Sequence, residues 1–217
     1  MFSNMEQLLR LAAEKKTALW QIILENEMQL TAKTKNQIFE NLNSCFQVMT
    51  ESANKALSEP QETVGNLITG TAFRQEAYSH ADDSLCGPFI NRVMALALSC
   101  SEVNAAMGKI CAAPTAGSCG ILPAVLIGVQ ERYGLTRRQV LQGLMTASGI
   151  GSIIMKNATV AGAEGGCQAE CGVAAAIAAA AAVEMRGGSP QTAANACSIA
   201  LVNIMGLVCD PVAGLVQ

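Results

Sequence analysis

The chain has few aromatic and few charged residues. Aromatic residues make up 4% of its 217 residues, charged residues make up 14%, and the net charge is −3. Sparse aromatic side chains leave little material for stacking against bases, and a slightly acidic chain lacks the clustered lysine and arginine that favour nucleic acid. We therefore expect no nucleic-acid partner.

Histidine is nearly absent as well, since His80 is its one occurrence. Cys167 and Cys171 lie four positions apart and could share one face of a helix. A structural zinc ion needs four such ligands, and one histidine in the whole chain leaves this pair short of the other two. A structural zinc site is therefore not expected.

Long apolar segments and export signals are missing too. The longest apolar stretch, residues 172–183, is mostly alanine and too short to cross a bilayer, so we expect no membrane association. The N-terminus has no basic segment followed by an apolar one, which predicts no signal peptide. The nine cysteines do not have the spacings of a disulfide framework and indicate the reducing cytoplasm.

Apolar residues, in contrast, are abundant, at 51% of the chain. This content is ample for a large core and high for a monomer, so we expect a homo- or hetero-oligomer with a sizeable buried interface. Four cysteines lie in apolar patterns with helical spacing and are expected to be buried: Cys45, Cys86, Cys100 and Cys197.

The apolar residues recur with helical spacing nearly throughout, which predicts an all-α fold. The expected helices cover residues 5–16, 19–30, 72–80, 88–109, 121–132, 137–155 and 168–186, with a last helix from residue 190. A further helix, capped by either Thr31 or Thr34, is expected to run to about residue 57. Segment 58–70 contains a proline and two glycines and is typical of a loop. We place a boundary there, between an N-terminal helical arm (1–60) and a compact helical domain (61–217) with glycine-rich active-site loops.

One candidate binding loop, residues 112–120, directly precedes a helix. Free backbone N–H groups there, together with the hydroxyls of Thr115 and Ser118, would suit an anion such as a substrate carboxylate. The alternative is an ordinary capped turn.

A second candidate loop, residues 157–168, carries three glycines that allow close approach of the backbone to a ligand. Its polar residues Glu164 and Gln168, followed by Glu170, could equally be the solvated start of a helix. Lys156 could form a Schiff base, although a lysine beside a loop is usually only solvated.

Two thiols stand in unusual positions in the last third of the chain. Cys167 lies in the glycine-rich loop ahead of an alanine-rich helix, and Cys209 lies at the end of another helix. Thiols on glycine-rich bends at helix ends are suited to holding a soft metal centre.

Five strings of the sequence resemble one family, the α subunit of iron–sulfur-dependent bacterial L-serine dehydratase. They are Asn104–Lys109 (NAAMGK), Ala113–Ser118 (APTAGS), Asn157–Glu164 (NATVAGAE), Gly166–Glu170 (GCQAE) and Cys209–Gln217 (CDPVAGLVQ). They occur in the family's order and spacing, and the likeness covers essentially the whole chain.

The resemblance implies a [4Fe-4S] cluster held by three cysteines, of which Cys167 and Cys209 match two. It further implies that the open iron acts as a Lewis acid on the substrate hydroxyl while a base, to which no residue is assigned, removes the α-proton. L-serine then yields pyruvate and ammonia, a step of amino-acid catabolism toward gluconeogenesis. The implied substrate-binding residues are Thr115, Ala116, Gly117 and Ser118, with Asn104, Lys109, Asn157 and Glu164 as further candidates.

The chain departs from the family at its C-terminal end. The family's third ligand cysteine follows downstream of Cys209, and this chain stops at Gln217 before reaching it. We therefore expect a C-terminally truncated α subunit that is inactive alone, and the resemblance implies a further β subunit or a fused β domain. Two alternatives stay open: a related cysteine or threonine eliminase, and a helical interaction subunit that lacks the cluster.

Overall fold

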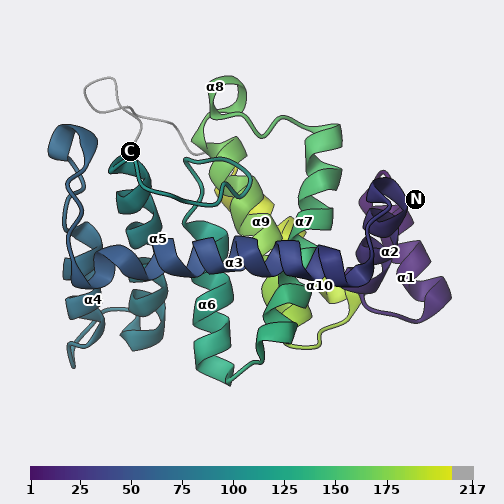
Figure 1. Cartoon of the computed structure of the whole chain (residues 1–217), viewed down its shortest axis with the longest axis horizontal. Coiled ribbons are helices and arrows are strands. Elements are labelled where there is room, and N and C mark those ends of the chain that lie inside the picture. Colours follow the sequence, from purple (N-terminus) through teal and green to yellow (C-terminus); the bar gives the residue numbers. More distant parts are fainter. Residues whose placement is uncertain (207–217) are drawn as a thin grey trace.

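The computed structural model describes residues 1–206, which form helices joined by loops, with no strand among them. The α-helices are α1 (Met5–Lys15), α2 (Leu19–Thr31), α3 (Lys35–Ser58), α4 (Thr71–Ser79), α5 (Gly87–Ala105), α6 (Ile121–Tyr133), α7 (Arg137–Asn157), α8 (Gly162–Gly165), α9 (Cys167–Met185) and α10 (Pro190–Ile204), and one 3₁₀ turn covers Val64–Asn66 (Figure 1). The predicted all-α fold is confirmed.

Local capping explains where several of these helices begin. Thr34 and Thr136 each accept a hydrogen bond from a backbone N–H three residues later, and the glutamine there bonds back to the cap. These reciprocal bonds satisfy donors that the first turn of a helix leaves without partners. At α10, Ser189 caps the helix and Pro190 occupies its first position, the favoured order.

The structure differs from the predicted pattern at one helix end and in one loop. α5 ends at Ala105 rather than at Lys109, because Met107 adopts a left-handed conformation (φ 60°) and Gly108 N donates to Val103 O at 2.8 Å. This is the hydrogen-bonding pattern of a Schellman stop, which turns the chain away from the helix axis. The second predicted loop also contains one short turn of helix, α8.

α9 is the central helix of the fold, and α6, α7 and α10 pack around it (Figure 1). Its buried face is largely alanine, whose small side chains allow helix axes to approach closely. Among the described residues, α9 is the one helix long and apolar enough to cross a membrane. Its packing against three neighbours accounts for that apolar composition without a membrane.

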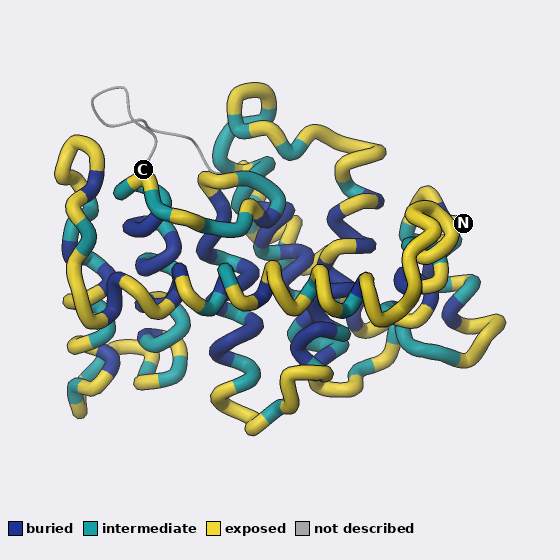
Figure 2. The backbone as a smooth tube through the Cα atoms, viewed as in Figure 1, coloured by how far each residue is buried: buried dark blue, intermediate teal, exposed yellow. Residues whose placement is uncertain are grey.

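α3 runs across the other helices and joins the two ends of the molecule (Figure 1). It packs against α5 most extensively and also against α4, α6 and α7. One apolar cluster therefore contains arm residues such as Leu19 and Phe46 together with Leu126 and Ile150. The buried positions concentrate in the helices behind α3 (Figure 2). The proposed boundary near residue 60 stays a prediction.

The expected burial of the four cysteines is correct for two of them. Cys100 and Cys197 are buried, whereas Cys45 and Cys86 are exposed. Cys86 lies outside the helical pattern, in a left-handed conformation (φ 68°) just before α5. Cys45 is on a helix as predicted, but it faces a groove instead of the core.

Candidate active site where two loops meet

The loop between α5 and α6 carries the first group of predicted site residues. Asn104, at the end of α5, donates from Nδ2 to Ala116 O at 3.3 Å. At the other end of the loop, a Cβ on Gly120 would collide with the carbonyl oxygen of Ala97 on α5. The loop therefore contacts α5 at Ala116 and at Gly120, and the close approach at Gly120 requires glycine there.

Thr115 and Ser118 form a small hydroxyl network inside this loop. Ser118 is buried, its Oγ lies 3.0 Å from Thr115 Oγ1, and it accepts a hydrogen bond from Thr115 N at 3.4 Å. Thr115 Oγ1 donates to Glu170 Oε1 at 2.6 Å, so Ser118 supplies the proton between the two hydroxyls. The Thr115 hydroxyl thus joins this loop to the start of α9, and Ser118 reaches α9 only through Thr115.

Glu170 joins the two glycine-bearing segments. Its carboxylate lies in the first turn of α9, 3.2 Å from where a Cβ on Gly117 would stand, and a Cβ on Gly162 would collide with it. Glycine at both positions leaves room for the carboxylate between the loops. Glu170 is not among the predicted site residues, although an acidic residue at the start of an otherwise apolar helix is a usable signal.

Cys167 is the first residue of α9 and is half-buried. Gly166 precedes it with φ 73° and ψ −179°, a conformation that glycine adopts readily. The helix dipole places partial positive charge at this terminus, which favours a thiolate. The next residue, Gln168, accepts a hydrogen bond at Oε1 from Gly206 N at 2.9 Å, so the end of α10 reaches the start of α9.

The second predicted cluster ligand, Cys209, lies outside the described residues. Within residues 1–206, no group of three or more His, Cys, Asp or Glu side chains is arranged to hold a metal ion. Two nearby cysteines are poor substitutes for a missing ligand. Burial, followed by the charge on Glu170, raises the pKa of Cys171, and burial raises the pKa of Cys119 to about 12. Both environments favour the protonated thiol over the thiolate that binds metal.

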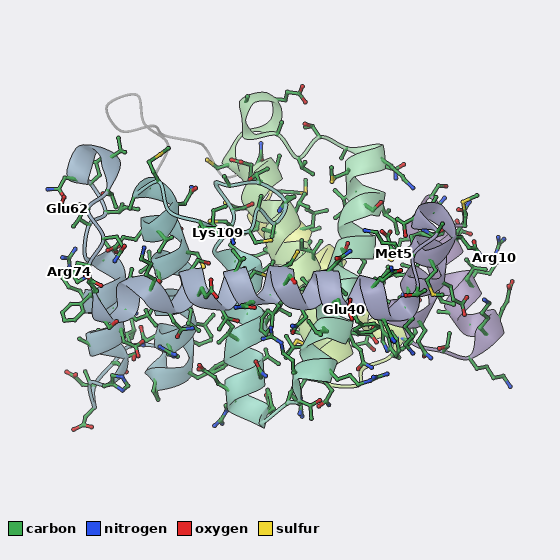
Figure 3. All side chains as sticks on the ribbon, in the orientation of Figure 1. Met5, Arg10, Glu40, Glu62, Arg74 and Lys109 are labelled. Atoms are coloured by element: carbon green, nitrogen blue, oxygen red, sulfur yellow. The ribbon has the colours of Figure 1, made fainter. Side chains whose placement is uncertain are left out.

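The remaining predicted site residues do not join this network. Asn157, at the end of α7, donates to Ser3 O at 3.1 Å and to Ile153 O at 2.7 Å, so it ties the N-terminus to α7. Glu164 is exposed and accepts a hydrogen bond at 2.6 Å from Thr159 within its own loop. Lys109 is exposed in the connection between α5 and α6 (Figure 3).

The structure thus brings one subset of the predicted residues together. Asn104 and the loop containing Thr115, Ala116, Gly117 and Ser118 meet the start of α9 through Glu170. The result is a pair of hydroxyls, a carboxylate and two helix N-termini within one small region, next to a thiol. Such a region can bind a small polar molecule at both an anionic and a cationic group. Substrate binding by these residues stays a prediction.

Comparison with known proteins finds relatives that match over the whole chain. A family model described as the serine dehydratase alpha chain matches residues 14–217. The chain is 46% identical to the L-serine dehydratase alpha chain of Peptoniphilus asaccharolyticus over 217 residues, which are all of this chain and 74% of that protein. It is 44% identical to the probable L-serine dehydratase alpha chain of Bacillus subtilis, again over the whole chain and 72% of that protein. It is 35% identical to the L-serine dehydratase TdcG of Escherichia coli, of which it covers 48%. The chain therefore belongs to the serine dehydratase alpha chain family.

Proposed function

We propose that this chain is the α chain of a lyase that deaminates L-serine to pyruvate and ammonia. The observation that carries the proposal is the contact between Thr115 and Glu170, which joins the loop before α6 to the start of α9. The relatives named as L-serine dehydratase alpha chains match the chain along its whole length, including both of these segments.

The polar groups of the site match the polar groups of serine. The hydroxyls of Thr115 and Ser118, at the N-terminal end of α6, would bind the substrate carboxylate. The carboxylate of Glu170 would then exchange its bond with Thr115 for one with the substrate ammonium group. Loss of the α-proton and of the β-hydroxyl as water gives an aminoacrylate, which tautomerises to an imine and hydrolyses to pyruvate and ammonia.

We further propose that Cys167 and Cys209 are two cysteine ligands of a [4Fe-4S] cluster. The half-buried Cys167 thiol at a helix N-terminus suits a thiolate ligand, and Gly206, tied to Gln168, precedes Cys209 by three positions. Three residues span at most about 11 Å of extended chain, so a ligand at Cys209 is compatible with one at Cys167. When bound, a cluster with three cysteine ligands supplies an iron with an open position as a Lewis acid.

The chain would act together with a serine dehydratase β subunit in the cytoplasm. Several apolar side chains support a protein partner, because they remain exposed on α10 and directly after it: Ile199 is 70% exposed, Val202 66% and Met205 70%. A related eliminase acting on threonine or cysteine stays the alternative. Comparing the turnover of the three amino acids by the αβ complex distinguishes these enzymes, because serine should have the highest kcat/KM.

The test of the substrate site compares Thr115→Val with Thr115→Ser in the αβ complex. Valine removes the hydroxyl that bonds to Glu170 and Ser118, whereas serine keeps it. We expect Thr115→Val to lower kcat/KM for serine by roughly tenfold to a hundredfold, as for the loss of a charge-assisted hydrogen bond. Thr115→Ser should retain most activity. Equal rates of pyruvate formation in both variants would contradict the proposed site.

The test of the cluster ligand compares Cys167→Ser with Cys86→Ser after anaerobic reconstitution of the αβ complex. Iron and acid-labile sulfide per α chain should fall to background in the first variant. They should stay at the wild-type value in the second, because Cys86 is exposed just before α5, in another part of the fold. Wild-type iron content in Cys167→Ser would rule out this ligand.

A further inference from the structure

A groove of about 640 Å³ lies behind the candidate active-site loop. α3 and α7 form much of its wall, and residues 111–114, which lead directly into Thr115, form another part. Most of its lining is apolar, including Met49, Leu122 and Leu144. Two thiols face this groove from separate elements: Cys45 comes from α3, and Cys111 comes from the connection between α5 and α6.

Both thiols line the same groove, and each side chain influences the other. Burial raises the pKa of Cys111 to about 11, with further contributions from the charge on Cys45 and from a hydrogen bond between the two side chains. Cys111 Sγ also lies 4.0 Å from Ala112 O, a weak contact that leaves the thiol able to turn. Neither cysteine is among the proposed cluster ligands, so cluster binding does not account for the pair.

The two thiols differ in their access to solvent. Cys45 is exposed on α3, whereas Cys111 is half-buried. A small reagent in the groove would therefore reach Cys45 first. A covalent adduct on Cys45 would then have the Cys111 thiol beside it, which is the arrangement of an attacking and a resolving cysteine.

We propose that Cys45 and Cys111 form a modification site that reacts with low-molecular-weight disulfides. The Cys45 thiolate attacks one sulfur of the reagent RSSR, forms the mixed disulfide Cys45–S–S–R and releases RS⁻, which takes up a proton. Cys111 loses its proton to solvent and attacks the Cys45 sulfur, so the Cys45–Cys111 disulfide forms and the second RSH leaves. Two protein thiols are oxidised, and one RSSR is reduced to two RSH.

This disulfide would tie the active-site loop to α3. Cys111 is four residues before Thr115, so a covalent bond at Cys111 limits how far the loop can move when substrate binds. The effect on turnover rests on the proposed function, whereas the formation of the disulfide does not.

The first experiment uses the full chain, reduced and then treated anaerobically with one equivalent of oxidised glutathione. Peptide mapping without reduction should find Cys45 linked to Cys111, with the loss of two free thiols per chain and no retained glutathione. Stable glutathione on Cys45 with Cys111 still reduced would overturn the proposal. A disulfide between another pair, or no reaction, would overturn it equally.

Three variants distinguish a specific disulfide between Cys45 and Cys111 from general reactivity of the exposed thiols. Cys45→Ser and Cys111→Ser should each abolish the internal disulfide, and Cys111→Ser should accumulate glutathione on Cys45. Cys86→Ser is the matched control, because Cys86 is also exposed but lies just before α5. It should form the Cys45–Cys111 disulfide at the wild-type rate, and a slower rate would argue that the wrong thiol has been assigned as the attacking one.

A last measurement distinguishes failure of this inference from failure of the proposed function. The αβ complex is assayed for pyruvate formation before and after oxidation, and after re-reduction. A reversible rise in KM for serine in the wild type, absent in Cys45→Ser, supports the tether. If the disulfide forms while the reduced complex has no serine turnover, the modification site stands and the proposed activity fails. A disulfide that leaves the kinetics unchanged would overturn the tether.

Discussion

Glu184, near the end of α9, shows how one side chain attaches the N-terminal arm. It accepts a hydrogen bond from Thr146 Oγ1 at 2.9 Å and from the backbone N–H groups of Leu19 and Trp20, at the start of α2. Burial raises the pKa of this carboxyl, and those hydrogen bonds only partly offset the effect. α2 has no side-chain cap of its own, so Glu184 serves as its N-terminal partner through tertiary contact.

The raised pKa of Glu184 makes the stability of the fold depend on pH in a predictable direction. The native state holds the Glu184 proton more tightly than the unfolded state does, so the contribution of this group to stability is full below the ordinary glutamate pKa and declines as pH rises above it. Urea unfolding between pH 4 and pH 8 should therefore show a shallower decline in Glu184→Gln than in the wild type. Parallel curves for the two proteins would contradict this reading.

A substitution at Gly162 can test whether the position of the Glu170 carboxylate matters for activity. Alanine at this position would push the flexible end of the Glu170 side chain away, so it should break the bond to Thr115 with little loss of stability. In the αβ complex, Gly162→Ala should lower kcat/KM for serine by about tenfold, the equivalent of roughly 1.4 kcal/mol. Ala163→Gly is the neighbouring control, and an equal loss in both variants would point to the loop backbone instead.

At the scale of elements, the contact between α5 and α6 depends on the absence of a side chain at Gly120. An added Cβ would meet the backbone oxygen of Ala97, which cannot rotate away. Gly120→Ala should therefore destabilise the chain by about 1–3 kcal/mol through overpacking. Gly151→Ala, on α7, is the matched control, since its Cβ would stand 3.9 Å from Ile177. It should be neutral or stabilising by up to about 1 kcal/mol, and chemical denaturation of both variants would measure the difference.

Glu102 holds the loop between α3 and α4 from within α5. It is fully buried, and its carboxylate accepts hydrogen bonds from Gln61 N at 2.7 Å, Gly70 N at 3.0 Å, Ala72 N at 3.2 Å and Thr71 Oγ1 at 3.3 Å. This carboxylate therefore stabilises both the loop and the first turn of α4.

Replacing Glu102 by glutamine should destabilise the chain by about 1–3 kcal/mol, because an amide group would face backbone donors that need an acceptor. The exposed Glu131, which pairs with Arg92 at 3.1 Å, provides a comparison in Glu131→Gln. That change should cost about 1 kcal/mol or less. Equal unfolding midpoints for the two variants would show that the buried carboxylate contributes no more to stability than the exposed one.

At the scale of the whole molecule, the arm and the rest share one apolar core. Leu19, on α2, is fully buried, so Leu19→Ala should cost about 2–5 kcal/mol. Leu30, 60% exposed on the same helix, is the control, and Leu30→Ala should change stability by about 0.5 kcal/mol or less. Trp20 is the one tryptophan and lies 6.1 Å from the ring of Phe39, so its fluorescence reports on the arm.

A shared core predicts cooperative unfolding. The fluorescence of Trp20 and the helical circular dichroism should follow one transition in the wild type and in Leu19→Ala. Loss of the Trp20 signal at lower denaturant than the loss of helix would show an arm that unfolds independently, and would support a boundary near residue 60.

The local sequence was sufficient wherever structure depends on neighbours along the chain. Thr136 and Ser189 marked the starts of α7 and α10, because a capping side chain bonds to backbone only two or three residues away. The predicted end of α5 is wrong, because the helix stops where Met107 adopts a left-handed backbone conformation. Methionine rarely adopts that conformation, so its position in the sequence does not indicate a helix end.

The sequence by itself determined the helical fold, the family and the strings that carry the candidate site. Helical periodicity, capping residues and motifs all depend on residues that are close together in the chain. Only the tertiary structure decided that Glu170 reaches Thr115, that Asn157 turns instead to the N-terminus, and that Cys45 faces a groove beside Cys111. Each of these depends on how helices far apart in the chain pack, and packing is set by the shapes of many side chains at once rather than by any local pattern.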